Sequence, residues 1–470
     1  MPDAKPMALD GQGRLLAAGG LNTAGPVRLT LDQAGFTVSL SSSAPLSAAY
    51  RDLAAIAVQP GAALLQLGDG PGAVRVILEQ FGDRLGTVIG ELRKRRARQR
   101  LSDRLVQLPD DPLPAIEYRR GDEHGVGLLA IQPWALELLP FDERRPLHHV
   151  RRADIGSVEG DLATGSVRIS VGDATEPAGA APILELLGLG AAVVRHAADV
   201  TALRDGASID ASTLVAGLLP DAPFATRTHL GQRLVDGRPA PWGDLGEDAG
   251  LLETAVLSEP TFAASYRTLR ARGGPAPVTW FAMAPTKPGG TERKAWFLVA
   301  LPGNLVALEL VSEGAHATYC FRVAPRATYD GRPPSVGDPA LDAAVSAISA
   351  ALIDARFLRE PMALPADQLA AARYLRYRLA LAALPSLAEA RRRFVARLVH
   401  TDDATWTAAL DDLVAWHTTA RDEAAEWPGR AAQEAAVLAA GGEDDGADGD
   451  RAPADGGTHP AEPDRPPPTA

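Results

Sequence analysis

The sequence predicts an α+β protein: tandem small antiparallel β modules, each closed by a C-terminal helix, followed by an all-α segment and a disordered tail. Two patterns lead to this prediction. Short runs in which apolar and polar residues alternate are separated by Gly- and Pro-rich turns, which is typical of half-buried strands. Each set of runs then gives way to apolar residues at helical spacing. The length of 470 residues exceeds what one hydrophobic core usually serves, so several domains are expected.

The first module is predicted over residues 25–104, after a flexible N-terminus at 1–24. Alternating apolar residues and strong turn sequences predict short strands at 27–31, 36–40, 54–58, 62–67 and 74–78. From Phe81 onward, apolar residues fall on one face of a helix that runs to about Leu101. We therefore expect a small β sheet covered by one helix.

The second module, residues 115–206, repeats this order. Strands are predicted at 127–131, 134–139, 150–158 and 166–171, and a closing helix at 181–203. The segments 50–56 and 150–155 are loosely alike, with Arg and Asp in similar places. This likeness suggests an internal duplication with a period of about 100 residues.

The third module, residues 207–362, is predicted as an antiparallel meander flanked by helices at 251–272 and 339–357. Its strands are predicted at 278–283, 294–301, 305–311 and 316–323. The turns between them are too short for a parallel crossover, which needs a dozen or more residues. Beyond it we expect a helical C-terminal segment at 363–440. A disordered acidic, Pro-rich tail is predicted at 441–470, because it has almost no apolar residues to bury.

Several short strands followed by one amphipathic helix resemble the pleckstrin-homology-like (PH-like) barrel, in which the helix plugs one end of a small bent sheet. Residues 27–101 carry the resemblance, and residues 127–204 repeat it. The third module shares the strands-then-helix order at 278–357. The resemblance implies recognition of a lipid, a peptide or a protein. The first hairpin lacks the run of Lys and Arg that phosphoinositide binders of this family carry.

Composition narrows the partner classes. The formal net charge of -12 disfavours non-specific binding to nucleic acid or anionic lipid. The single cysteine, Cys320, excludes an intramolecular disulfide and fits a reducing cytosol. We find neither a signal-peptide pattern nor an apolar run of about 18 residues, so we expect a cytoplasmic protein with no transmembrane helix.

One basic run is the candidate binding patch. It ends the first predicted helix and comprises Arg93, Lys94, Arg95, Arg96, Arg98 and Arg100. Cations are favourable at a helix C-terminus, so a solvated helix end is one interpretation. The other is a surface for an anionic partner, and the net charge favours an acidic protein segment, such as the chain's own tail. A second, smaller run at 391–393 has the same two interpretations.

Other motifs carry weaker functional signals. The Gly-rich segment 68–72 precedes a predicted strand, which indicates a hairpin turn and not a phosphate loop. The pair His148 and His149, with Asp142, Glu143 and His124 nearby, lacks metal-binding spacing and indicates a solvated loop or strand start. Cys320 is expected to be a half-buried structural residue. We therefore predict no catalytic residue, no cofactor and no metal ligand.

Three functions remain open. The favoured one is a non-catalytic protein-interaction or scaffolding protein. The first alternative is an enzyme with a site in the third module, where Trp280, Trp296, Tyr319 and Arg322 concentrate. The second alternative is a peripheral anion or membrane-surface binder that uses the basic helix end at 93–100.

Overall fold

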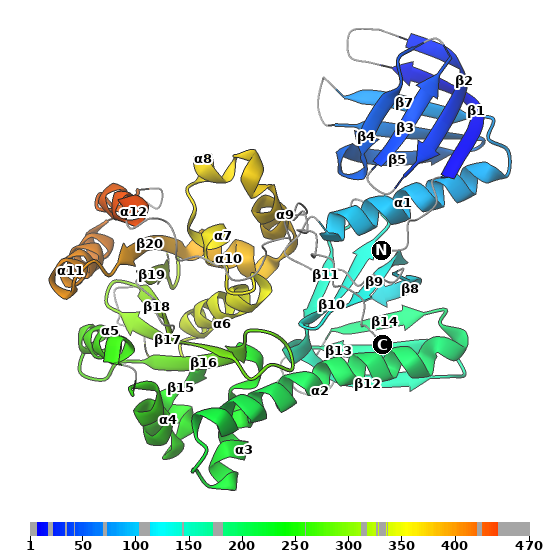
Figure 1. Ribbon diagram of the computed structural model, residues 1–470. Helices are drawn as coiled ribbons and strands as arrows, with labels where there is room; N and C mark the ends of the chain where they lie inside the picture. The colour runs from blue at the N-terminus through cyan, green and yellow to red at the C-terminus, as the bar shows by residue number, and fades with distance from the viewer. Residues whose placement is uncertain are drawn as a thin grey trace, which may run out of the picture.

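A computed structural model confirms an α+β protein with three antiparallel sheets (Figure 1). It describes residues 7–16, 22–32, 35–41, 43–68, 73–102, 113–142, 145–172, 182–258, 260–311, 317–325, 328, 335, 337–420 and 425–439. The tail at 441–470 and most of the Gly-rich turn at 68–72 lie outside the described residues. In the part of the chain that is described, no helix is long and apolar enough to cross a membrane.

The first sheet has seven strands and one following helix, α1 (Arg84–Ser102). Its strands are β1 (Met7–Leu16), β2 (Asn22–Leu31), β3 (Gly35–Leu40), β4 (Leu46–Ala49), β5 (Leu53–Gln59), β6 (Ala62–Leu67) and β7 (Val74–Glu79). The order across the sheet is β4-β3-β2-β1-β7-β6-β5. Leu29, Val38 and Leu65 from the strands pack with Val88 and Leu92 from α1 in a fully buried core.

The prediction of a flexible N-terminus is wrong for β1, which lies at the centre of this sheet and pairs with both β2 and β7. The alternation of apolar residues is hidden because two positions of the strand are glycines. A Cβ on Gly11 would lie 2.6 Å from a ring carbon of Phe81, and one on Gly13 would lie 3.0 Å from the Ile77 carbonyl oxygen. The space that apolar side chains would fill at these two positions of β1 is therefore occupied by neighbouring residues, Phe81 and Ile77 among them.

Gly11→Ala should destabilise the first sheet by about 1–3 kcal/mol, because the added methyl overpacks Phe81, which is 5% exposed. Hydrogen exchange of the β1, β2 and β7 amides measures this loss. Adding Phe81→Leu should restore part of the protection. Gly90→Ala on α1 is the matched control, because nothing lies within 4 Å of a Cβ there. Equal protection in Gly11→Ala and wild type would contradict this packing.

The second sheet repeats the topology of the first. Its strands are β8 (Ala115–Arg120), β9 (Glu123–Ile131), β10 (Ala135–Pro140), β11 (His148–Arg151), β12 (Ile155–Asp161), β13 (Ser166–Val171) and β14 (Ile183–Leu187). The order β11-β10-β9-β8-β14-β13-β12 matches the first sheet position by position. Equivalent 3-10 turns, η1 (Tyr50–Asp52) and η2 (Arg152–Asp154), occupy the two alike segments. In each turn the Asp carbonyl accepts a bond from a glycine amide, Gly68 or Gly172.

The helix predicted at 181–203 is wrong in its first half, which forms β14. The helix-favouring Leu and Glu residues there are overridden by sheet pairing, and Gly188 and Gly190 end the strand with positive φ angles of 69° and 51°. Helix α2 (Val193–Leu218) then follows and continues past residue 206. The predicted boundary between the second and third modules therefore falls inside one helix.

The third sheet has helices on both faces. Its strands are β15 (Ala240–Pro241), β16 (Thr279–Pro285), β17 (Arg293–Leu301), β18 (Leu305–Val311), β19 (Ala317–Arg322) and β20 (Phe394–Val399), in that order. One face packs against α6 (Pro339–Asp354), α9 (Leu375–Ala383) and α10 (Pro385–Arg393). The other packs against α3 (Phe224–Arg233), α4 (Asp248–Val256), α5 (Pro260–Arg272) and α11 (Asp403–Thr419). The four predicted meander strands are confirmed, and the single helix predicted at 251–272 is two helices.

The prediction that only helices follow residue 363 is wrong at β20. This strand pairs antiparallel with β19, with Tyr319 opposite Arg397. The strand begins at Phe394, directly after the last residue of α10. The helical spacing of apolar residues in α10 therefore leads to the prediction that the helix continues. The strand conformation of β20 depends on β19, which is distant in the sequence. We call the third sheet and the helices that pack on it the third unit. Helices α7 (Glu360–Ala363), α8 (Ala366–Leu369) and α12 (Arg430–Ala439) also belong to it.

Two helices connect the three sheets. Helix α1 lies between the first and second sheets in Figure 1, and its Ala97 packs with Leu128, Ala130 and Leu139 of the second. Helix α2 covers the opposite face of the second sheet, and its end packs with α3 and the third sheet. The second sheet is therefore covered on both faces.

Candidate functional site

His149 on β11 joins the second sheet to the third unit. Its Nδ1 lies 2.7 Å from Glu137 Oε1, and its Nε2 lies 3.0 Å from Asp354 Oδ1 at the end of α6. Burial disfavours the imidazolium, but the charges of Asp354 and Glu137 outweigh it and raise the pKa of His149 to about 10. The histidine is therefore charged at neutral pH. We call this contact the histidine junction.

The histidine junction does not have the geometry of a catalytic triad. The Ser386 hydroxyl donates to Asp354, and not to His149. In a triad the histidine lies between the serine and the carboxylate and takes the serine proton. The contact therefore serves to hold α6 and α10 against the second sheet.

A second ionic contact joins the same two units and is named here the arginine junction. Arg152 is 2% exposed, and its Nη2 lies 2.8 Å from Asp210 Oδ2 and 2.9 Å from Asp236 Oδ1. Its guanidinium carbon lies 4.7 Å from the centre of the Trp134 ring. Asp210 also accepts a bond from the Gly289 amide. One buried cation is thus shared by two carboxylates.

A third buried polar cluster lies within the third unit. Burial raises the pKa of Glu309 on β18 to about 8, so this carboxyl is largely protonated at neutral pH. The Thr318 hydroxyl donates to Glu309 Oε2 over 2.7 Å and accepts from Trp406 Nε1 over 3.1 Å. His400 Nε2 lies 2.9 Å from the same hydroxyl. The cluster ties β18 and β19 to α11.

The basic run on α1 does not form a single open surface. Arg95 Nη1 donates to the Asp32 carbonyl over 2.6 Å, and Arg96 Nη2 donates to the Ala54 carbonyl over 2.8 Å. Arg93, Lys94, Arg95, Arg96 and Arg98 are all partly buried, and the Arg100 side chain lies outside the described part of the chain. At least two of these arginines therefore hold α1 on its own sheet.

Most of the other sequence candidates lie in the core, among them Tyr319, whereas Arg322 is half-buried and His124 and Asp142 are exposed. Trp280 and Trp296 are buried at 2% and 0% exposure, and Trp296 Nε1 donates to the Ser349 hydroxyl. Cys320, predicted to be half-buried, is fully buried, and burial raises the pKa of its thiol. The histidine pair begins strand β11, as one of the two sequence interpretations had it, but it is not solvated: His148 is buried and its Nε2 lies 3.1 Å from Glu123 Oε1.

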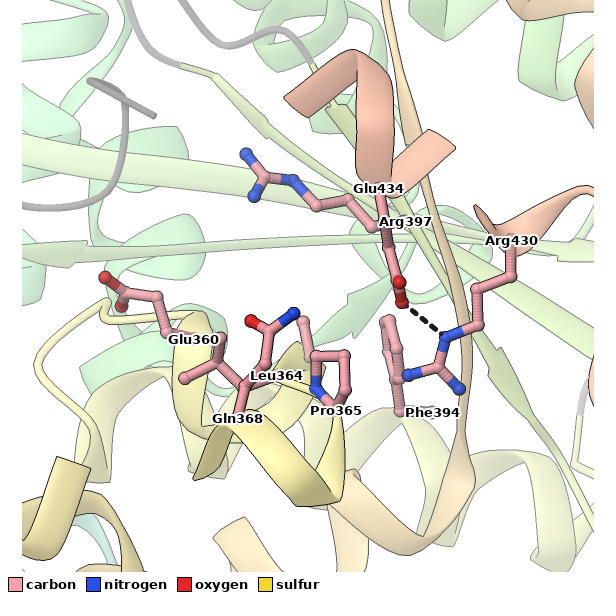
Figure 2. A pocket seen from close by; sticks show the side chains of 9 residues that line it. Glu360, Leu364, Pro365, Gln368, Phe394, Arg397, Arg430 and Glu434 are labelled. Carbon is pink, nitrogen blue, oxygen red and sulfur yellow. Dashed lines mark hydrogen bonds and ion pairs between the residues drawn. The ribbon is translucent and has the colours of Figure 1, made fainter. Parts of the chain in front are cut away.

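An open cleft of about 100 Å³ lies between α7–α8, β20 and α12 (Figure 2). We call it the arginine cleft. Its lining residues are Glu360, Ala363, Leu364, Pro365, Gln368, Phe394, Arg397, Arg430 and Glu434. Apolar side chains, among them Leu364, Pro365 and Phe394, line it together with charged groups from three separate segments of the chain.

Arg430 is held in the arginine cleft by two exposed ion pairs. Its Nε lies 2.8 Å from Glu434 Oε1, and its Nη1 lies 3.0 Å from Glu426 Oε1. Both glutamates are on its own helix or next to it, at i±4 spacing, and their side chains are 42% and 73% exposed. Such pairs contribute only about 0.3–0.5 kcal/mol each. A ligand carboxylate could therefore replace either at little cost.

Arg391 adds positive charge beside the arginine cleft. Its Nη1 donates to the Pro361 carbonyl over 3.0 Å, and no carboxylate of the described residues pairs with it. Burial and the charge of Arg430 lower the pKa of its guanidinium. The sequence run at 391–393 thus marked this region, but the prediction without β20 could not place it beside a cleft.

No protein-family model matches the chain, and a search of curated proteins finds no matching relative.

Proposed function

We propose that this chain is a non-catalytic protein-interaction or scaffolding protein, built from two PH-like modules and a third unit that carries the arginine cleft. The main support is the pair of ionic junctions, at His149 and Arg152, which fix the second module against the third unit. Helix α1 likewise fixes the first module against the second, because it packs on both sheets. A scaffold must keep its modules in fixed relative positions in order to hold several partners in a defined arrangement.

The PH-like assignment of both modules rests on their shared architecture. Each has seven antiparallel strands in the same order, with the first strand central, and each is followed by a helix that packs on the sheet. The resemblance to PH-like barrels implies recognition of a lipid, a peptide or a protein, and we propose a protein or peptide. His149 and Glu309, whose pKa values are raised to about 10 and about 8, are engaged in contacts between elements and do not line the arginine cleft.

Gln368→Trp should abolish or weaken at least tenfold the binding of a partner protein, because a large ring at this exposed rim position fills the arginine cleft. Ala366→Trp is the matched control, since Ala366 is exposed nearby but does not line the cleft. Proteins retained from a source-cell extract by the full chain are compared for wild type and both variants, and each candidate is then purified and its Kd measured.

A partner that binds wild type and Ala366→Trp but not Gln368→Trp supports the proposed function. If wild type, Gln368→Trp and Ala366→Trp all retain the same partners with the same Kd, the cleft is not the binding surface. If the chain retains no protein and instead converts a small molecule, the scaffold proposal is wrong.

A further inference from the structure

We infer that the arginine cleft binds an acidic side chain of a partner polypeptide, whose carboxylate pairs with Arg430 in the place that Glu434 now occupies. This inference rests on the proposed function and adds the chemical class of the ligand. The sequence analysis favoured the basic end of α1 for an acidic partner and gave the smaller run at 391–393, which adjoins this cleft, the same two interpretations.

The cleft already holds a carboxylate in the position that the ligand would take. In Figure 2 the Glu434 carboxylate points into the space above Phe394 and meets the Arg430 guanidinium. Glu434 comes from the same helix as Arg430, so moving it aside needs only a change of side-chain rotamer. An incoming carboxylate would then make the same charge-assisted bond at 2.8 Å or so, as Glu434 does.

The local charge favours an anion over a cation. With Glu426, which pairs with Arg430, the elements that form and adjoin the cleft (α7, α8, α10, β20 and α12) carry five arginines and five acidic residues. The cleft region is therefore close to neutral on a chain whose net charge is -12. Arg391 is bonded to the Pro361 carbonyl of the neighbouring α7, and the charge of Arg430 lowers the pKa of its guanidinium. An anion bound at Arg430 would offset this repulsion, whereas a cation would add to it.

The shape of the cleft favours a side chain over a free inorganic anion. A volume of about 100 Å³ holds the methylene groups and carboxylate of one acidic residue. Phe394, Leu364 and Pro365 offer apolar contact for the methylene groups. The rim at Gln368 is exposed, so the peptide backbone can continue on the surface on either side. A small hydrated anion would gain nothing from the apolar wall.

The test uses the full chain and a fluorescein-labelled twelve-residue Glu-rich peptide, titrated by fluorescence anisotropy at two salt concentrations. A Gln-rich peptide of the same length is the neutral control. We expect the Glu-rich peptide to bind and the Gln-rich peptide not to bind. Arg430→Gln should weaken binding at least tenfold, and Glu434→Gln should tighten it several-fold, because the internal competitor for Arg430 is removed.

Matched variants separate the cleft from general electrostatics. Arg168 and Glu185 pair at 2.9 Å on the second sheet, so Arg168→Gln and Glu185→Gln make the same charge changes away from the cleft. Both should leave the Kd unchanged within twofold. Misfolding would weaken binding, so tighter binding by Glu434→Gln cannot arise from it. The test therefore remains decisive even if Arg430→Gln proves unstable.

Several outcomes would overturn the inference. These are equal effects of the cleft and second-sheet variants, an unchanged Kd in Glu434→Gln, or competition by inorganic phosphate or an oligonucleotide at concentrations below those of the peptide. If the Glu-rich peptide fails but Gln368→Trp still loses a native partner, the proposed function stands and the acidic ligand class is wrong. If the peptide binds at the cleft but Gln368→Trp keeps every partner, the cleft binds acidic groups and the partner proposal is wrong.

Discussion

Replacing His149 by alanine is expected to cost about 3–5 kcal/mol of folding free energy at pH 7, because it removes the imidazolium that pairs with two buried carboxylates, Glu137 and Asp354. Glu137 and Asp354 have side chains only 1% and 3% exposed, so water cannot take over the role of the imidazolium. Urea unfolding followed by tryptophan fluorescence measures the loss. Adding Glu137→Gln and Asp354→Asn to the alanine variant should recover part of it.

The cost of His149→Ala should also depend on pH in a defined direction. The pKa of His149 is raised to about 10 in the folded protein, above the usual value of 6.5. A raised histidine pKa gives stability that is fully present below pH 6.5 and is lost as pH rises through 10. The difference between wild type and variant should therefore shrink from pH 6.5 to pH 10.

His148→Ala is the matched control for this pH dependence. His148 is on the same strand and is buried, and burial lowers its pKa. Removal of its ring should therefore destabilise the protein without a change in cost between pH 6.5 and 10. If His149→Ala costs the same at pH 6.5 and pH 10, the histidine junction does not contain an imidazolium.

Arg152→Ala is expected to have an effect of similar size, about 3–5 kcal/mol, because Asp210 and Asp236 lose their shared cation. Arg152→Lys should cost less than the alanine variant, since an ammonium keeps the charge, but it cannot reproduce the fork of the guanidinium or its contact with Trp134. Urea unfolding of the full chain measures both variants.

The rescue variant for the arginine junction is Arg152→Ala with Asp210→Asn and Asp236→Asn. It removes all three charges, so its stability should lie well above that of Arg152→Ala alone. A triple variant as unstable as the single variant would show that the loss comes from the cavity and not from the unpaired carboxylates.

The sequence predicts the elements whose folding signal is local. The four strands of the third meander are continuous apolar runs joined by short turns, and all four are present. Strands β1 and β14 were missed for opposite local reasons: glycines remove the alternation in β1, while Leu and Glu in β14 favour a helix. Strand β20 has Phe394, Val395 and Val399, which favour a strand, but it is short and follows α10 directly, and its pairing with β19 completes its conformation.

The candidate site was less predictable than the fold. Runs of arginine at 93–100 and 391–393 look alike in the sequence, but Arg95 and Arg96 bond to the backbone of their own module, whereas Arg391 lies beside the arginine cleft. The cleft itself is assembled from three segments. Periodicity and charge along one segment do not reveal which other segments will meet it.

The late position of β20 has a consequence for synthesis of the protein on the ribosome. About 70 residues separate the end of β19 from the start of β20. At roughly 5–20 residues per second, the β19 edge of the nascent third sheet waits several seconds for its partner. During that interval its backbone N–H and C=O groups can pair with another chain. Premature termination before Phe394 would leave this edge permanently open, so truncated products are expected to aggregate more than the complete chain.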